Sequence, residues 1–466
     1  MHTSKSTIAL LIFAFIVFCQ SSVAQNLTLE QCKEMALNQN IDLKITKEQI
    51  LMSKNSRKMA FSQFFPSIDG NASYIRMNKQ FQLMQEDFTS QSIIDNIPFS
   101  IPPIPFPIPI DLSNITLLPA SDTRFGQEHN FVFNVGLTQP IFAGGRIYEL
   151  YKMSQTVEKM ASQNSSLERQ KILYETEELY WTIVSVQEKK NVISAYQAML
   201  QNLEKDVEAY ISQGLALRND LLRVKLKMNE VDLMLFKVNN GLKLAKMALC
   251  QKIGMDINAD IQLQESEIVI SEEVVVYENI RQAAQLNRPE LKLLESSVKL
   301  TESGIKMSRA QFMPTIGFTA NYLTLRPNPY RGLADEFGSD YMFGFVMNVP
   351  IFHWFEKHHT HAIAKNNRNI AKLKLENAQQ KISMETLMVS NEILEAKKRI
   401  DISKLSVEQS LENLKLIQDR HKEGTMKTAE LLEAQALWQE AQTNYIESKA
   451  LYKSLQIKLK KSSGEL

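Results

Sequence analysis

Residues 214–249 read GLALRNDLLRVKLKMNEVDLMLFKVNNGLKLAKMAL, and residues 424–459, 210 positions later, carry the same pattern. In both stretches apolar or small residues recur at alternating intervals of three and four, which is typical of helices packed in a coiled coil. The first ladder is Leu221, Val224, Met228, Val231, Leu235, Val238, Leu242, Ala245 and Leu249. The second is Leu431, Ala434, Trp438, Ala441, Tyr445, Ser448, Tyr452, Leu455 and Leu459.

A glycine followed six residues later by an acid precedes each of these apolar ladders. Gly214 lies six residues before Asp220, and Gly424 lies six residues before Glu430. A glycine in this place indicates a helix end, and an acid indicates the first turn of the next helix. We therefore predict long helical hairpins over about 145–252 and 355–462. Their first helices, of some 68 residues, would each be roughly 100 Å long.

The repetition extends beyond the hairpins. Residues 63–68 (QFFPSI) align with residues 311–316 (QFMPTI). This predicts a first repeat over 25–253 and a second over 277–466. Between them, residues 254–276 break the helical pattern with β-branched runs, which favours a small mixed region. The first repeat also has an insertion at about 78–128. Its proline-rich stretch IPFSIPPIPFPIP predicts a long, extended loop.

The sequence period changes to two after Pro66 and Pro314. The alternation predicts strands at about 66–77, 129–141, 314–325 and 340–351, each with one apolar face and one small, polar face. Outer-membrane strands have this length and alternation, although a soluble sandwich gives a similar local pattern. The leader and the lack of further strands favour the membrane.

Residues 1–24 resemble a cleaved signal peptide, with Lys5, an apolar run from Ile8 to Phe18 and small residues before Gln25. A membrane anchor and a lipoprotein modified at Cys19 are the alternatives. The chain has 53 Lys and Arg against 52 Asp and Glu. Loss of Lys5 leaves 52 against 52, which argues against a nucleic-acid partner. Cys32 and Cys250 would remain, and whether they pair stays open.

Four strands cannot close a barrel, and open strand edges are not tolerated in lipid. Copies of the chain must therefore combine. Two would give eight strands, three twelve and four sixteen, and each ring would enclose a tube.

With its two repeats, its Phe65-Pro66 and Met313-Pro314 strand-opening turns and its glycine-acid-Leu-Leu hairpins, the chain resembles the TolC family of outer-membrane ducts. The resemblance implies an α+β membrane protein. It would be a homotrimer, with a 12-stranded β-barrel (four strands per protomer) continuous with a 12-helix periplasmic α-barrel of coiled coils, plus the small equatorial region. The proline-rich insertion would be extracellular. The implied partners are a periplasmic adaptor protein and an inner-membrane pump of the RND or ABC type, besides outer-membrane lipid.

The resemblance also places the functional residues at the hairpin tips. Adaptor contacts are expected at Tyr210, Gly214, His421 and Gly424. A periplasmic gate is expected at Glu430, Glu433, Asp220 and Arg223. Carboxylates repeated around a narrow opening repel one another and attract cations. The competing interpretation is that these acids only stabilise a helix start.

No nucleophile elbow, phosphate-binding loop or dinucleotide fingerprint is found, so we expect a conduit without catalytic activity or cofactor. The histidines His353, His358, His359 and His361 have spacings that can bind zinc, but we expect a polar rim and no metal. The predicted function is the outer-membrane channel of a tripartite efflux pump or type I secretion system. The alternative is an exported structural or interaction coiled-coil protein without channel activity.

Overall fold

The computed structural model describes residues 25–78, 81–82, 84–90, 115–120, 124–125, 127–270 and 277–466. The predicted signal peptide at 1–24 and the stretch IPFSIPPIPFPIP of the insertion lie outside these residues. The chain forms two compact units. One comprises residues 1–55, 155–302 and 366–466, and the other comprises 56–154 and 303–365. Each unit therefore contains segments of both sequence repeats, so the boundaries of the units differ from those of the repeats.

Helices make up most of the described chain. The two long hairpins have matching lengths, because each pairs a helix of 67 residues with one of 36. The hairpins are α5 (Arg146–Ser212) with α6 (Arg218–Ile253), and α9 (Glu356–Lys422) with α10 (Thr428–Ser463). The shorter helices are α2 (Leu29–Gln39), α3 (Ile41–Ser62), α7 (Tyr277–Asn287) and α8 (Pro289–Ala310).

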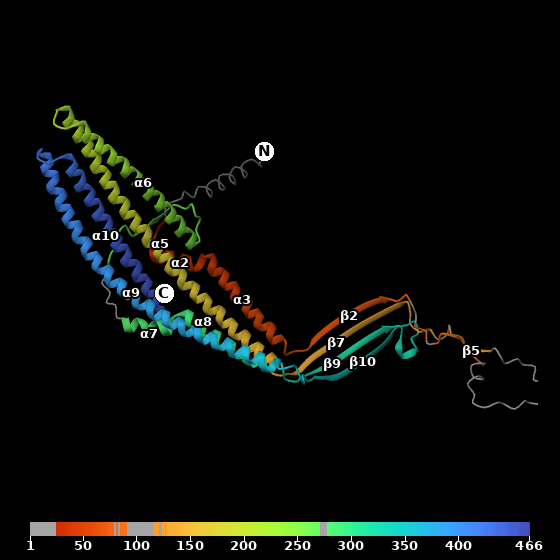
Figure 1. The fold of residues 1–466 in the computed structure, drawn as a ribbon. Helices are drawn as coiled ribbons and strands as arrows, with labels where there is room; N and C mark the ends of the chain where they lie inside the picture. The colour runs from red at the N-terminus through yellow and green to blue at the C-terminus, as the bar shows by residue number, and fades with distance from the viewer. Residues whose placement is uncertain are drawn as a thin grey trace, which may run out of the picture. The chain divides into compact units, whose positions relative to one another are not determined.

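In the first unit the hairpins form one layer in the order α6, α5, α10, α9 (Figure 1). Polar pairs connect each neighbour to the next: Gln197 with Asp232, Lys189 with Glu447, and Lys458 with Glu392. The two sequence ladders face into this layer. Val224 and Val231 of α6 are buried in one cluster with Leu431 and Trp438 of α10. The three-four periodicity therefore provides the core between the hairpins.

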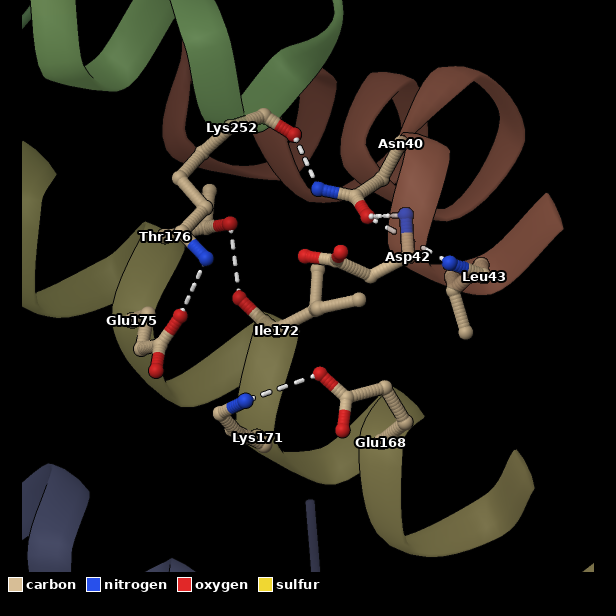
Figure 2. Close-up of polar contacts among 9 residues, drawn as sticks. All are labelled: Asn40, Asp42, Leu43, Glu168, Lys171, Ile172, Glu175, Thr176 and Lys252. Atoms are coloured by element: carbon tan, nitrogen blue, oxygen red, sulfur yellow. Dashed lines mark hydrogen bonds and ion pairs between the residues drawn. The ribbon is translucent and has the colours of Figure 1, made fainter. Parts of the chain in front are cut away.

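The end of α6 meets the start of α3 through one side chain (Figure 2). Asn40 donates from Nδ2 to the carbonyl oxygen of Lys252 at 2.9 Å, and its Oδ1 accepts the backbone N–H of Asp42 at 2.8 Å. Lys252 also pairs with Glu175 of α5. Asn40 thus satisfies the exposed backbone groups of two helix ends at once.

The second repeat has a similar junction between α10 and α8. Gly464 ends α10 with φ of +79°, and a Cβ there would lie 3.0 Å from the Cβ of Asn287. Arg288, which follows Asn287 in the chain, is buried, and its Nη1 lies 2.7 Å from Oε2 of Glu385 in α9. In both repeats, two shorter helices are therefore joined end to end beside a long one.

A small strand pair lies against the middle of α5. Strand β1 (Gln25–Leu27) pairs in parallel with β8 (Ile261–Leu263). The Tyr180 hydroxyl of α5 hydrogen-bonds the Leu27 carbonyl oxygen at 3.2 Å and also contacts Glu265. This is the mixed structure expected within 254–276, of which residues 271–276 lie outside the described chain.

The main sheet of the second unit has four antiparallel strands. Its strands are β2 (Ser67–Arg76), β7 (His129–Ala143), β9 (Thr315–Arg326) and β10 (Gly338–Asn348), in the order β10-β9-β7-β2. One row across the sheet is Tyr341, Tyr322, Val135 and Gly70. Apolar side chains therefore gather on one face. The opposite face carries Asn134 and Asn321, whose amides are 3.5 Å apart.

The described flanks of the insertion are paired. Strand β3 (Phe81–Gln82) pairs with β6 (Arg124–Phe125), and β4 (Phe88–Thr89) pairs with β5 (Thr116–Leu118). Strands β3, β4, β5 and β6 contain no proline, so their N–H groups can form ladders. The proline-rich part of the expected loop lies outside the described residues. Within the described residues, no helix has the length and hydropathy to cross a membrane.

Candidate functional site

Each hairpin tip is closed by the same backbone motif. Gly214 has φ of +77° and donates to the Ile211 carbonyl oxygen at 3.0 Å, while Leu215 donates to that of Tyr210 at 2.8 Å. In the other tip, Gly424 has φ of +73° and donates to His421, and Thr425 donates to Arg420, both at 3.0 Å. These are Schellman turns, which need a left-handed residue and therefore favour glycine. The sequence predicted both turns.

The predicted gate residues lie in the first turns after the tips. Asp220 is half-buried, and its Oδ2 accepts the backbone N–H of Leu217 at 3.2 Å. Glu430 occupies the matching place in α10 and is also half-buried, whereas Arg223 and Glu433 are exposed. For Asp220, the hydrogen bond to Leu217 directly supports the interpretation that the acid stabilises the start of a helix. The gate remains a prediction for all four residues.

The structure brings the two tips of one chain together through Tyr210 and His421. Their ring centroids are 6.1 Å apart, and His421 Nε2 lies 3.4 Å from the Thr428 hydroxyl oxygen. His421 is 7% exposed. Sequence reasoning placed both aromatic residues at the tips but did not find their contact or Thr428. His421 and Thr428 lie seven residues apart, on either side of the turn. In the sequence this spacing indicates a hairpin but not a contact between the two side chains.

Burial lowers the pKa of His421, although the negative charges of Asp206 and Asp220 oppose this effect. The folded pKa lies below the ordinary value of 6.5, so the unfolded tip binds a proton more readily. The contribution of neutral His421 to the stability of the tip is therefore present above pH 6.5 and is lost as the pH falls below it.

We expect the contact between the tips to loosen at pH 5.5 in the wild-type chain but not in His421→Gln. The measurement is the rate of backbone hydrogen exchange over residues 203–214, expressed at each pH as the rate in the wild type divided by the rate in the variant. A ratio that stays constant from pH 7.5 to pH 5.5 would contradict the role of His421.

The four strand-opening residues lie between helices and strands of the second unit. Phe65 donates its N–H to Ser62 at 3.0 Å, and its ring lies 5.3 Å from that of Phe61. Pro66 directly precedes β2, and Pro314 directly precedes β9. Met313 donates its N–H to the Ala310 carbonyl oxygen at 3.2 Å. The turns thus end each helix where the following proline disfavours helical backbone.

Two other predictions concern histidine and cysteine. The described residues contain no group of three His, Cys, Asp or Glu side chains placed to hold a metal, and the rings of His358 and His359 lie 5.5 Å apart. Cys32 and Cys250 are buried and unbonded. Burial, with the charges of Glu265 and Cys250, raises the pKa of the Cys32 thiol to about 12.

The sequence of the second repeat matches a known family. Residues 280–465 match the family described as outer membrane efflux protein. Comparison with curated protein sequences gives no match.

Solved structures extend the likeness to nearly the whole chain. The outer membrane protein VceC of Vibrio cholerae is 14% identical with a TM-score of 0.72, and the match covers 94% of this chain and 96% of that one. The CmeC outer membrane channel of Campylobacter jejuni is 17% identical with a TM-score of 0.73, covering 94% and 85%. The MtrE outer membrane channel of Neisseria gonorrhoeae, in its open state, is 16% identical with a TM-score of 0.69, covering 94% and 88%. Residues 280–465 thus match the outer membrane efflux protein family in sequence, and nearly the whole chain has the fold of solved outer-membrane channels.

Proposed function

We propose that the chain is the outer-membrane channel of a tripartite efflux pump or of a type I secretion system. It is a passive homotrimeric conduit that carries substrates across the periplasm and the outer membrane. Its periplasmic end is opened by an adaptor protein, and an inner-membrane pump of the RND or ABC type supplies the energy. No nucleic acid and no cofactor take part.

The observation that carries this proposal is that, within the described residues, the four-stranded sheet and the helical layer each have two open edges. In that sheet, β10 and β2 each have one neighbour among the described strands. Large apolar side chains are exposed along alternate positions of β10: Tyr341, Phe343, Phe345 and Met347. Such a face suits lipid, where an unpaired strand edge is costly. Pairing β10 of one copy with β2 of the next removes both edges.

The helical layer also has two uncovered edges. Its edge helices α6 and α9 each expose a second apolar stripe, on the side away from the buried ladder. On α6 the stripe is Leu222, Leu226, Leu233, Phe236 and Leu244. On α9 it includes Ile370, Leu373, Met384, Leu387, Leu394, Ile402 and Leu405. Two different edges that cover each other form a head-to-tail contact, and such contacts close into rings.

Three copies give twelve strands for a barrel and twelve long helices for a periplasmic tunnel. The match of residues 280–465 to outer membrane efflux proteins supports this number, and twelve strands fall within the range of bacterial barrels. A large exposed apolar stripe on a soluble coiled coil would be an aggregation hazard, so the edges argue against the alternative of an isolated structural protein.

The acids after the tips are proposed to set the charge of the periplasmic opening. Three copies place six carboxylates from Glu430 and Glu433 near one another, and repulsion between them is relieved by cations. The double variant Glu430→Ala and Glu433→Ala should lose cation block in planar bilayers by about tenfold, since about 1.4 kcal/mol of attraction would be removed.

A matched control for that measurement is Glu408→Ala with Glu412→Ala on α9, which removes two exposed carboxylates of the same hairpin away from its tip. Equal block in the wild type and the tip variant would show that Glu430 and Glu433 only stabilise the start of α10.

The exposed turns at Gly214 and Gly424 are proposed to contact the adaptor. Both backbones lie open to solvent, and a Cβ added at either glycine would meet no atom within 4 Å. An adaptor that binds the open tip more tightly than the closed one shifts the population toward the open state.

The experiment that tests the whole proposal combines location with conductance. Membranes from producing cells are fractionated, and the protein is extracted with detergent and reconstituted in a planar bilayer. The proposal requires protein in the outer membrane, a trimer mass and single-channel currents. A water-soluble protein without currents would support the structural coiled coil instead.

A further inference from the structure

A cavity of about 580 Å³ lies in the second unit, where α8 ends, β10 ends and α9 begins. Its volume falls within the range of small-molecule sites in proteins. One wall of the cavity is apolar and largely aromatic, and it is formed by Phe312, Met313, Pro350, Ile351, Phe352 and Phe355. Apart from Met313, which belongs to a strand-opening turn, none of these residues lies in the strand-opening turns or the hairpin tips.

The rest of the lining is cationic or titratable. It contains Arg309, Lys357, His353, His358 and His361 together with Ser308, and no carboxylate belongs to the described lining. His361 Nδ1 lies 3.3 Å from the Ser308 hydroxyl, which fixes one side of the ring. Burial lowers the pKa of His361, and the positive charges of Lys365, Arg309 and His358 lower it further. The groups around the cavity therefore produce a positive potential that favours an anion.

The cavity continues the apolar face of the sheet. On β10 the exposed residues Tyr341, Phe343, Phe345 and Met347 share one face, and Val349 and Ile351 extend this alternation beyond the strand end. Met342 and Val346 are exposed on the other face. Ile351 is 92% exposed, and Trp354 beside it is 84% exposed. Tryptophan is enriched where a membrane meets water, because its ring is apolar and its N–H is polar. The cavity thus lies where the apolar face of the sheet gives way to charged helix.

We propose that this cavity binds one anionic phospholipid of the leaflet that faces the periplasm, and we refer to it as the lipid site. Arg309 and Lys357 bind the phosphate, and the aromatic wall packs against the first part of an acyl chain. This assignment rests on the proposed outer-membrane function. A free phosphate ion would use the cations but leave the apolar wall exposed, so the combined lining favours a lipid over a soluble anion.

The test uses detergent-purified trimers, delipidated and titrated with 1-palmitoyl-2-oleoyl-phosphatidylglycerol while lipid occupancy is followed by native mass spectrometry. The double variant Arg309→Ala and Lys357→Ala should bind about 30-fold more weakly, since each cation near an anionic lipid contributes about 1 kcal/mol. Both side chains are exposed, so the variant is expected to fold. Lys372→Ala with Lys374→Ala is the matched control, because it removes two exposed cations from α9 outside the cavity.

Each result decides between the lipid and its competitors. The proposal stands if tight binding of phosphatidylglycerol falls in the lipid-site variant only, and if inorganic phosphate at millimolar concentration does not displace the lipid. It fails if phosphate displaces the lipid, if phosphatidylcholine binds equally well, or if both double variants behave alike. It also fails if the lipid-site variant loses its trimer, because the cavity would then be occupied by a second copy. Single-channel currents are recorded on the same preparations, so a failed lipid site with intact currents leaves the proposed function unaffected.

Discussion

Replacing Gly144 with alanine is expected to destabilise the sheet unit by about 4 kcal/mol, enough to prevent stable trimers. Gly144 has φ of +60°, a left-handed conformation that costs a residue with a Cβ roughly 1–2 kcal/mol. A Cβ at this position would also lie 2.5 Å from the Cβ of Met313 and 2.7 Å from the carbonyl oxygen of Ala310. Neither atom belongs to a flexible side-chain end, so the turn before β9 must shift.

The neighbouring residue supplies a matched control. Gly145 has φ of +84°, but no atom lies within 4 Å of a Cβ there, so Gly145→Ala should cost only the roughly 1–2 kcal/mol of the backbone conformation. The measurement is the heat resistance of the detergent-solubilised trimer, scored as the temperature at which it dissociates. Equal midpoints for the two variants would refute the close approach of Gly144 to Met313.

Placing a charge in the exposed stripe of α6 or α9 is expected to have the largest effect on assembly. Phe236 is 70% exposed in the single chain, and burying such a side chain stabilises a contact by about 3 kcal/mol. In the proposed trimer, which has three such contacts, Phe236→Asp should remove about 9 kcal/mol of stabilisation, before the cost of desolvating each carboxylate is added. Leu394→Asp should have a comparable effect from the α9 side.

Lys237→Asp and Lys404→Asp are the controls, because both lysines are exposed and lie on the same helices. Oligomeric state is measured by sedimentation in detergent at equal protein concentrations. We expect monomers for Phe236→Asp and Leu394→Asp, and trimers for both lysine variants. Trimers throughout would mean that the stripes are not the contacts between copies.

Periodicity accounts for what the sequence could predict. The ladder from Leu221 to Leu249 alternates between three and four, and the strand from Thr315 alternates between two faces, so each identifies its element without tertiary information. Gly214, Gly424, Pro66 and Pro314 mark where those elements end, because each restricts the backbone locally.

Contacts between distant segments could not be predicted in this way. Tyr210 and His421 are 211 positions apart, and only packing of the two hairpins brings their rings together. The cavity near Arg309 and Lys357 likewise combines two helices and a strand end. Asp220 shows a further limit, because an acid after a turn fits both a helix start and a gate, and only the folded chain reveals its bond to Leu217.

The junction at Asn40 has a mechanical consequence. One long member, α5, is covalently continuous beside it, whereas its companion is made of α6 and α3, which meet through the Asn40 amide and the Lys252 carbonyl oxygen and through a buried cluster that includes Leu43 and Ile253. Bending a continuous helix strains its backbone hydrogen bonds, whereas two helices that meet end to end can change their angle at the seam without bending either one. Bending of the hairpin near Asn40 would therefore strain the backbone of α5 but not that of α6 or α3.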